Sequence, residues 1–452
     1  MKKRIGILIF IACSFTFSCK ESSNNNPTYS KDIAPIIYKN CTPCHRPNQI
    51  GHFNLQTYTD VQSNAKAILY TVSNHLMPPW PADIHYTRFA NELVLEDKEI
   101  ELIKTWVNNK CPIGDSNAIP PVPNYPARSL LGTPDLTIPV IPRKIIGDFN
   151  DQFLLIKVPF ALPTETYAHT IEFVPGNTNV VHHVNADIVR FNETKKANVF
   201  DGNWVHNTVT DSTIKDAYQK MGMLHDDGSY PTLHRNAMNY LPGVMAQEYP
   251  DGIGDILLGK KNAFLFSDIH YGPYWEDTWD SSYINIFFSK TPPNRTVKEF
   301  QLGTLGVSPV LPALIIPADS IVTVRSKYVL PEPISVITLN PHMHLLGKSF
   351  WGFAVPPSGD TIPLIRINNW DFNWQNYYKP KKPIVIPAGA VIYAQGVYDN
   401  TSKNPFNPNK PPKTITDKNG TMRTTDEMFQ FIIMYLEYQK GDEEMVLEKE
   451  KK

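Results

Sequence analysis

The chain has 452 residues, with 43 lysines and arginines against 44 aspartates and glutamates, so its net charge of −1 gives no indication of nucleic-acid binding. Hydrophobic residues make up 42% and charged residues 19%, which excludes global disorder, and the length predicts roughly three domains. Proline is frequent, at 40 residues, so long helices must be few. Short runs rich in Val, Ile, Tyr and Phe favour a mainly β protein.

The first 19 residues have the pattern of an export signal. Three basic residues precede an apolar run over 5–17 that is too short to cross a bilayer as a mature helix. The following Cys19 resembles the lipidated cysteine of a lipobox, although Leu is absent three residues before it and Cys13 competes for the role. We expect a lipoprotein-type signal over 1–19 and a polar tether over 20–29. The protein would then be exported and lipid-anchored to a bacterial cell envelope, in the periplasm or on the outer surface.

Residues 41–45 read CTPCH, the pattern in which two thiols bond to haem vinyl groups and the adjacent histidine ligates iron. The alternative is a thioredoxin-like redox pair, which the following His45 and an exported location disfavour. Met77, in HLMPPW, is predicted to be the second axial ligand, with His75 as its rival and a plain core methionine as the alternative. The covalent haem would be held by Cys41, Cys44, His45 and Met77.

The sequence around CTPCH predicts a small all-α module over 30–115. Helical apolar spacing occurs over 32–39, 59–75 and 96–109. With CTPCH, this pattern resembles a class I cytochrome c domain. Cys111 lies just after the last of these segments and is expected to be a buried small hydrophobe.

A proline-rich linker over 116–129, which contains IPPVPNYP at 119–126, separates this module from some three hundred residues of β-like texture. Three histidine groups stand out there: VVHHV with His182 and His183, DIHYGP with His270, and PHMHLLGKSF with His342 and His344. His342 and His344 would share one face of a strand, as two metal ligands do, although two ordinary polar strand residues are an equal alternative for this pair on its own. Adjacent His182 and His183 face opposite sides, so they could share a metal only if the backbone bends or one ring uses its other nitrogen.

Residues 130–440 resemble the copper type II, ascorbate-dependent monooxygenases. The shared features are the His-His pair, YLPGVMAQEYPDG from Tyr240, a His-Tyr after an apolar strand, His-x-His followed by Leu-x-Gly-Lys, and a Glu-Met pair in TTDEMFQF. WDFNWQNYY from Trp370 and IPAGAVIYAQGVYDN from Ile386 match in kind and order. The resemblance implies two copper ions. It makes His182, His183 and His270 ligands of an electron-relaying first copper, and His342, His344 and Met428 ligands of an oxygen-binding second copper.

Copper chemistry agrees with this implied division, because a thioether favours Cu(I) and is a poor ligand for the competing zinc. Met428 could instead be a strand core residue. The family architecture implies two jelly-roll sandwiches over 130–297 and 298–440, followed by a charged tail over 441–452. The expected fold is therefore a small all-α cytochrome c domain and two mainly β sandwich domains. The disulfides of the family are missing, since no cysteine follows Cys111.

The resemblance implies hydroxylation of a C–H bond of a small organic substrate with O₂. We expect the fused haem to relay electrons from an unidentified donor, either an ascorbate-like reductant or a redox protein. Asn340, Gln430 and Ile432 replace the Arg, Asn and Tyr with which the peptide-amidating relative holds a peptide carboxylate, so amidation of glycine-extended peptides is not expected. The alternatives are an electron-transfer or copper-binding lipoprotein without oxygenase activity, and a binding module for surface assembly.

Overall fold

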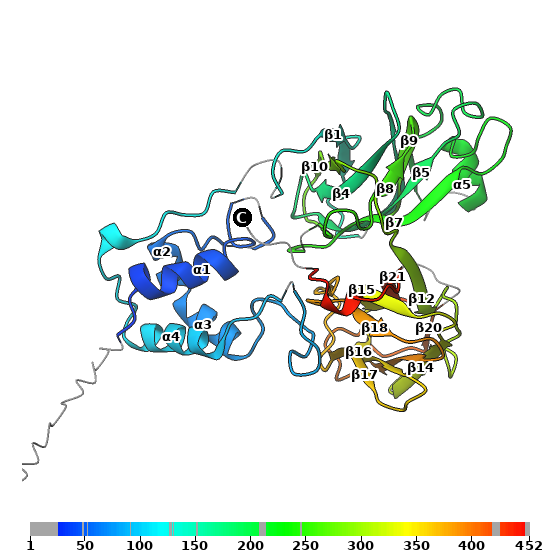
Figure 1. Ribbon diagram of the computed structural model, residues 1–452. Coiled ribbons are helices and arrows are strands. Elements are labelled where there is room, and N and C mark those ends of the chain that lie inside the picture. The colour runs from blue at the N-terminus through cyan, green and yellow to red at the C-terminus, as the bar shows by residue number, and fades with distance from the viewer. Residues whose placement is uncertain are drawn as a thin grey trace, which may run out of the picture.

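The structure is a computed structural model, and it describes residues 26–447 except 48, 52, 91, 126–128, 130, 151, 208–213, 245 and 418–424. The expected signal, the lipidation site Cys19, most of the tether and the end of the charged tail lie outside the described residues. The described part is mostly β-sheet with a few short helices, arranged as one helical body and two β-bodies (Figure 1). No helix in it combines the length and apolar character needed to cross a membrane.

The helical body is built around one buried apolar cluster that includes Tyr29, Ile37 and Trp106. Its segments are η1 (Tyr29–Ile33), α1 (Ala34–Asn40), α2 (Tyr58–Ser63), α3 (Ala65–Ser73), α4 (Asp97–Asn108) and η2 (Ser116–Ala118). The helix expected over 59–75 is divided, because the Asn64 amide donates to the Asp60 carbonyl at 2.8 Å and ends α2. Cys111 is buried beside α4, as expected.

The stretch between α3 and α4 leaves this cluster and packs on the second β-body. Ala82 and Phe89 belong to the apolar core of that body. The Asp83 carboxylate accepts hydrogen bonds from Arg366 at 2.7 and 3.0 Å and from Asn368 at 3.0 Å. The helical module expected over 30–115 is therefore not self-contained, since part of it completes the core of a domain some three hundred residues away.

The first β-body is a sandwich of two antiparallel sheets that enclose one core. One sheet has the order β6-β3-β9-β5-β7, with β6 (Val205–Asn207), β3 (Gln152–Ala161), β9 (Lys261–Tyr271), β5 (Val181–Arg190) and β7 (Thr232–Tyr240). The other has the order β1-β11-β4-β8, with β1 (Leu136–Pro139), β11 (Tyr283–Phe288), β4 (Thr166–Val174) and β8 (Ile256–Leu258). Outside them lie β2 (Arg143–Ile145), its partner β10 (Thr278–Asp280), and α5 (Ile214–Lys220).

The second β-body is likewise a sandwich of two four-stranded antiparallel sheets. The first has the order β12-β21-β15-β18, with β12 (Lys298–Gly303), β21 (Phe429–Glu437), β15 (Ile334–Met343) and β18 (Ile384–Ile386). The second has the order β14-β19-β16-β17, with β14 (Ile321–Val329), β19 (Val391–Asp399), β16 (Gly347–Val355) and β17 (Ile362–Ile367). A ribbon of β13 (Ile315–Ile316) and β20 (Ile415–Thr416) and the short η3 (Asp442–Glu444) complete it. Burial alternates along β19, as expected for a strand with one face in the core.

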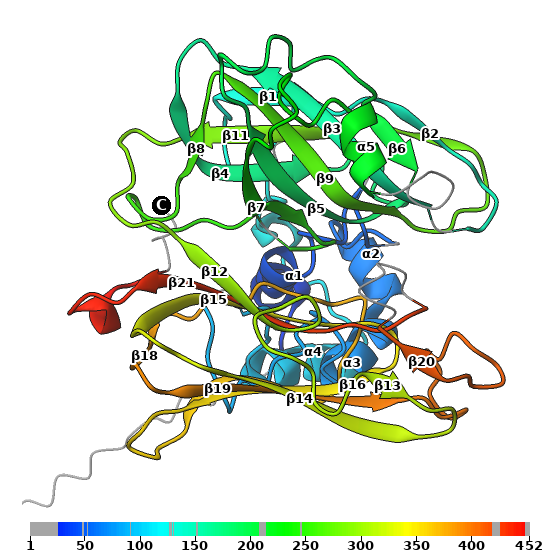
Figure 2. The ribbon, with the colours of Figure 1, turned by 90° about the vertical axis from the view of Figure 1, so that its right-hand side faces the viewer.

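The two sandwiches are joined by a shared apolar cluster. Tyr249 and Ile253 of the first pack with Ile337, Leu436 and Leu447 of the second. The helical body lies beside this junction (Figures 1 and 2). The junction fixes how the facing surfaces of the two sandwiches meet, and those surfaces carry the histidine groups.

A buried ion pair next to this junction leads to a stability prediction. Arg295, in the connection between the sandwiches, donates to both oxygens of Asp442 at 2.8 and 3.0 Å, and Ser335 donates to the same carboxylate at 2.6 Å. These bonds lower the pKa of Asp442 to about 2, against 3.8 for a free side chain. Because the pKa is lower in the folded chain, the stabilisation is present above about pH 4 and is lost as the pH falls toward 2.

Asp442→Asn should therefore lower the free energy of unfolding by about 2 kcal/mol at neutral pH. Urea unfolding of both proteins from pH 6 to pH 2 measures this difference, which should shrink toward zero at the acid end. A difference that stays constant with pH would contradict a role for the ionised carboxylate.

Candidate metal centres

The first histidine group lies on two neighbouring strands of the first sandwich. His182 and His183 are in β5, His270 is in β9, and His183 is paired with His270 in the antiparallel register. The register shifts between Val181 and His183, so His182 is the extra residue of a β-bulge. In a regular strand, His182 and His183 would point to opposite faces of the sheet. The bulge bends the backbone here, so that both rings lie next to the ring of His270.

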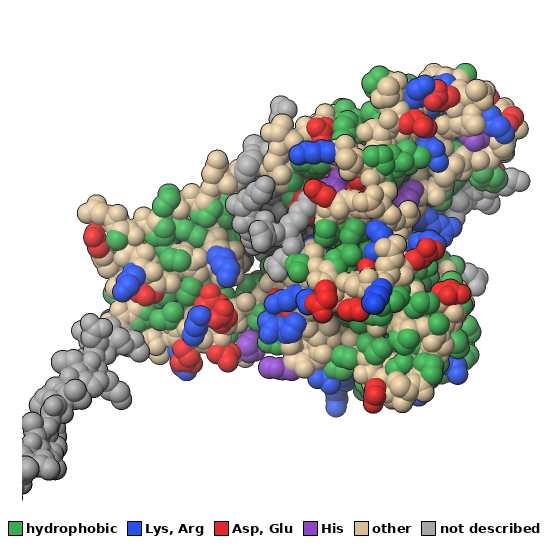
Figure 3. All heavy atoms as spheres, in the orientation of Figure 1, with side chains coloured by type: hydrophobic (Ala, Val, Ile, Leu, Met, Phe, Trp, Pro, Cys, Tyr) green, Lys and Arg blue, Asp and Glu red, His purple; other side chains and the backbone are tan. Residues whose placement is uncertain are grey.

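The three imidazoles converge closely enough to bind one metal ion. One nitrogen from each ring can be chosen such that all three lie within 4.8 Å of one another. The ring of His270 is 4% exposed and stacks on Phe153, with 4.4 Å between centroids and 10° between planes. Figure 3 shows histidine side chains (purple) on the side of the upper sandwich that is turned toward the lower one. A packed, partly open set of three imidazole nitrogen donors suits copper or zinc.

The second group lies at the end of β15 in the second sandwich. The rings of His342 and His344 are 5.0 Å apart between centroids and nearly perpendicular, at 86°. Nδ1 of His342 lies 2.6 Å from Oε1 of Gln375, and Nδ1 of His344 lies 3.1 Å from the carbonyl oxygen of Asp426. Both oxygens are acceptors, so each Nδ1 carries the proton. Nε2 is then the nitrogen with the lone pair that a metal needs.

Met428 directly precedes β21, the strand beside β15. The last paired residues are Met343 and Phe429, so His344 and Met428 each lie one residue beyond the end of this ladder, on neighbouring strands. Met428 is 1% exposed, and its carbonyl accepts a hydrogen bond from Tyr398 at 2.6 Å. Its position in the sheet suits a ligand shared with the two histidines.

Glu427 holds the turn that carries His344. Its carboxylate accepts the backbone N–H of His344 at 2.9 Å and that of Leu346 at 2.7 Å. Complete burial raises the pKa of Glu427 to about 8, although these hydrogen bonds act in the opposite direction. The Glu-Met pair therefore combines a residue that shapes the backbone with a residue that offers a thioether.

Gln375 was not among the expected site residues, although it lies in the WDFNWQNYY segment. Its amide nitrogen donates to the Phe372 carbonyl at 3.0 Å, which leaves the amide oxygen directed at His342. Gln375→Leu should therefore weaken copper binding at the second site by about 10- to 100-fold, because the ring of His342 loses its orienting partner. Competition titration with a copper chelator measures this affinity. An affinity equal to that of the wild type would contradict an orienting role for Gln375.

The CTPCH segment forms the turn that follows α1. The backbone N–H groups of Cys44 and His45 both donate to the Cys41 carbonyl, at 3.1 and 2.9 Å, and Nδ1 of His45 lies 3.2 Å from the Phe53 carbonyl oxygen. Burial raises the pKa of Cys41 to about 12 and also raises that of Cys44. A thioredoxin-like redox pair needs a thiol with a lowered pKa, so the buried environment of Cys41 and Cys44 disfavours a thioredoxin-like role.

The two candidate second axial ligands lie on the loop after α3. Met77 is partly buried, whereas His75 is exposed and has a left-handed backbone with φ of 53°. The donor set of CTPCH fits a covalently bound haem, because both thiols belong to one turn and the adjacent imidazole is oriented through Nδ1.

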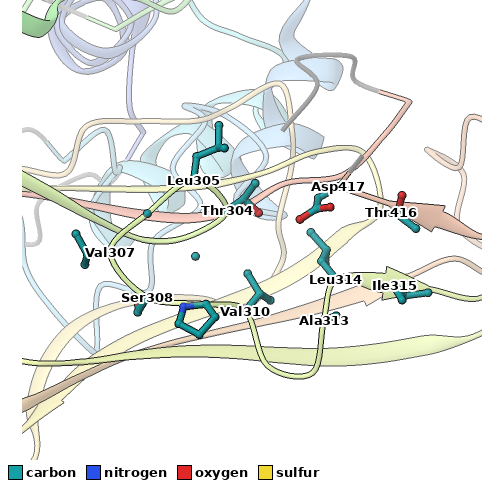
Figure 4. Close-up of a pocket in the computed structure, with 13 residues that line it drawn as sticks. Thr304, Leu305, Val307, Ser308, Val310, Ala313, Leu314, Ile315, Thr416 and Asp417 are labelled. Carbon is teal, nitrogen blue, oxygen red and sulfur yellow. The ribbon is translucent and has the colours of Figure 1, made fainter. Parts of the chain in front are cut away.

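A separate hollow of about 740 Å³ opens on the second sandwich between the end of β12 and the β13–β20 ribbon (Figure 4). Most of the residues that line it are apolar or small, including Val310 and Leu314, and Asp417 lies at one side (Figure 4). Thr304, at its rim, donates its N–H to the Phe429 carbonyl at 2.7 Å. None of the described residues that line this hollow is a candidate metal ligand.

The geometry thus defines a β-sandwich protein with two candidate histidine metal centres. Residues 312–449 match the sequence profile described as "Copper type II ascorbate-dependent monooxygenase, C-terminal domain". This match contains His342, His344 and Met428, and it supports the copper type II, ascorbate-dependent monooxygenase family. Proteins of this family bind copper and are oxidoreductases that use O₂ and a reductant such as ascorbate.

Comparison with solved structures gives only distant likenesses. The structure titled "Structure of PNGF-II in P21 space group" is 12% identical, with a TM-score of 0.26, over 67% of this chain and 66% of that chain, just under two thirds of its length. The CBM22-1-CBM22-2 tandem domain of Xyn10C from Paenibacillus barcinonensis is 7% identical, with a TM-score of 0.14, over 64% of this chain and 80% of that chain. Such low scores carry no argument about fold. A comparison with curated proteins finds no match.

Proposed function

We propose that the protein is a copper-dependent monooxygenase that hydroxylates a C–H bond of a small organic substrate. The observation that carries this proposal is the family match over the segment with His342, His344 and Met428. A second set of three converging imidazoles is linked to this segment through Phe372, whose ring contacts those of both His182 and His344. The overall reaction is RH + O₂ + 2e⁻ + 2H⁺ → ROH + H₂O, in which one oxygen atom enters the substrate and the other leaves as water.

The two sites differ in ways that suit different tasks. Bound copper supplies one-electron redox chemistry at both sites and the reaction with O₂ at the second. The three imidazoles of His182, His183 and His270 suit both oxidation states of copper, as electron relay requires. At the second site the thioether of Met428 favours Cu(I), while Gln375 and the Asp426 carbonyl hold the two rings with Nε2 as the donor.

The substrate proposed here is not a peptide C-terminus. Asn340 occupies the position of the carboxylate-binding arginine of the peptide-amidating relative, and its amide donates to the Asn376 carbonyl at 3.0 Å. It is neutral, 7% exposed and engaged in holding the 370–380 segment. A small neutral or apolar compound therefore suits this site better than a glycine-extended peptide.

We further propose that the helical body holds a covalent haem through Cys41, Cys44 and His45, with Met77 as second axial ligand, and that this haem delivers electrons to the copper sites. A Cβ added at Gly243 would lie only 3.3 Å from the sulfur of Cys44, so CTPCH is close to the loop after β7. β7 pairs with β5, where Tyr240 is opposite Val184, the neighbour of His183. The proposed donor is thus held against the strands that carry the first site. Lipidation at Cys19 would anchor the assembly to the cell envelope.

The test is a coupling experiment on the full chain. Protein loaded with copper is supplied with ascorbate and O₂, candidate aromatic and aliphatic compounds are added, and hydroxylated product and hydrogen peroxide are both quantified. Product formed in proportion to O₂ consumed is the expected result. Peroxide as the sole product with every compound would favour the electron-transfer alternative and contradict the proposal.

A further inference from the structure

The segment 370–380 contacts both sandwiches and the stretch of chain that follows Met77. Tyr378 exchanges backbone hydrogen bonds with Leu339 of β15, at 2.8 and 2.9 Å. Its ring lies against those of Trp80 and Phe89 from the segment after Met77, with 5.2 Å between centroids in each case. Earlier in the same segment, Phe372 reaches the first sandwich. One short stretch therefore connects the proposed haem loop, the second metal site and the first.

Phe372 lies between the two histidine groups. Its ring is 6.2 Å from that of His182 between centroids, with the planes nearly parallel at 19°. The same ring is 5.7 Å from that of His344, with the planes almost perpendicular at 80°. His182 belongs to the first sandwich and His344 to the second, so a single aromatic side chain bridges the space between the two sites. Both arrangements are among those that aromatic rings prefer.

The position of Phe372 is set by the turn that carries it. The Asp371 carboxylate accepts the backbone N–H and the side-chain amide of Asn373, at 2.9 and 3.0 Å. The Trp374 N–H donates to the Asp371 carbonyl at 3.1 Å, and the Gln375 amide donates to the Phe372 carbonyl. Since Gln375 also orients His342, the turn and the second site are held by one side chain. Phe372 is thus fixed relative to the ligands.

We propose that Phe372 is a positioning residue that sets the spacing of the two metal sites and provides the packed route for electrons between them. This inference rests on the proposed function. If copper were bound at both sites, the step served would be the transfer of one electron from Cu(I) held by His182, His183 and His270 to Cu(II) held by His342, His344 and Met428, with no proton transferred and no bond formed or broken. Electronic coupling falls off less steeply through packed atoms than through water, so the ring between His182 and His344 favours this transfer.

Phe372→Leu is the decisive variant, because leucine keeps apolar bulk but removes the aromatic ring. Phe406→Leu, at a half-exposed position of the same sandwich, is the matched control. The first readout uses metal-free protein with isotope-labelled histidine rings. The ring current of Phe372 should shift the signals of His182 and His344 in the wild type and in Phe406→Leu, and these shifts should be lost in Phe372→Leu. Unchanged histidine signals in Phe372→Leu would overturn the proposed bridge.

The second readout uses protein loaded with copper. Phe372→Leu should retain both copper ions, while the rate of electron passage from the first site to the second, followed by stopped-flow after mixing with reductant, should fall at least about tenfold. A rate equal to that of Phe406→Leu would overturn the positioning role. Failure of the wild type to bind copper would instead contradict the proposed function, and the metal-free readout keeps the two failures distinct.

Discussion

Replacing His344 by alanine should remove copper from the second site and lower hydroxylation by about a thousandfold or more, since several kcal/mol of stabilisation by the metal is lost. His344 is one of the two imidazoles of that site, its ring is held through Nδ1 by the Asp426 carbonyl, and it is 3% exposed. Removing it leaves His342 and a weak thioether donor, which is too few ligands for tight binding. Metal analysis should find about one copper ion per chain in place of two.

His85→Ala is the control for this variant, because His85 is exposed and lies outside both histidine groups. It should keep both copper ions and full activity. A His344→Ala protein that still binds two copper ions and turns over at the wild-type rate would rule out the second site as the place of oxygen chemistry.

Replacing His270 by alanine should produce a different defect of similar size. The first site loses its most buried ligand, the ring that lies within 5.0 Å of both His182 and His183 between centroids. Steady-state hydroxylation should fall by about a thousandfold, because electrons no longer reach the second site through the first. The second site keeps all its ligands, so one copper ion per chain should remain, with an electron paramagnetic resonance signal unchanged from that of the wild-type second site.

His234→Ala, on β7 of the same sheet, controls for the loss of a histidine from this sandwich. The proposed division of roles predicts that His270→Ala keeps the second-site spectrum and His344→Ala keeps the first-site spectrum. Loss of both copper ions in either variant would show that the two sites do not form independently.

The sequence predicted the kinds of structure better than their boundaries. Proline content and short β-branched runs correctly predicted a mainly β protein, and sandwiches were expected only because of the family resemblance. The helix over 59–75 was expected to be continuous, but the Asn64 amide competes with the backbone and ends α2. The docking of Ala82 and Phe89 on the second sandwich could not be predicted, because local patterns do not specify partners three hundred residues away.

For the candidate metal sites too, local sequence patterns predicted the features that depend on one strand and missed those that depend on distant partners. His342 and His344 share a face because of strand alternation, which the sequence alone contains. His182 and His183 converge through a β-bulge, and a bulge depends on pairing with β9 that no local pattern encodes. Gln375 and Phe372 were missed as individual residues for a related reason. Their roles come from a turn that lies against ligands of both sandwiches, although their segment matched the family in kind.

In the proposed function, two copper ions bind to five imidazoles and a thioether from distant parts of the chain. Anomalous diffraction at the copper edge, from crystals of the copper-loaded protein, would locate these ions. We expect two peaks per chain, one among His182, His183 and His270, and one bounded by His342, His344 and the sulfur of Met428. A single peak, or a second peak remote from the sulfur of Met428, would contradict the proposed function.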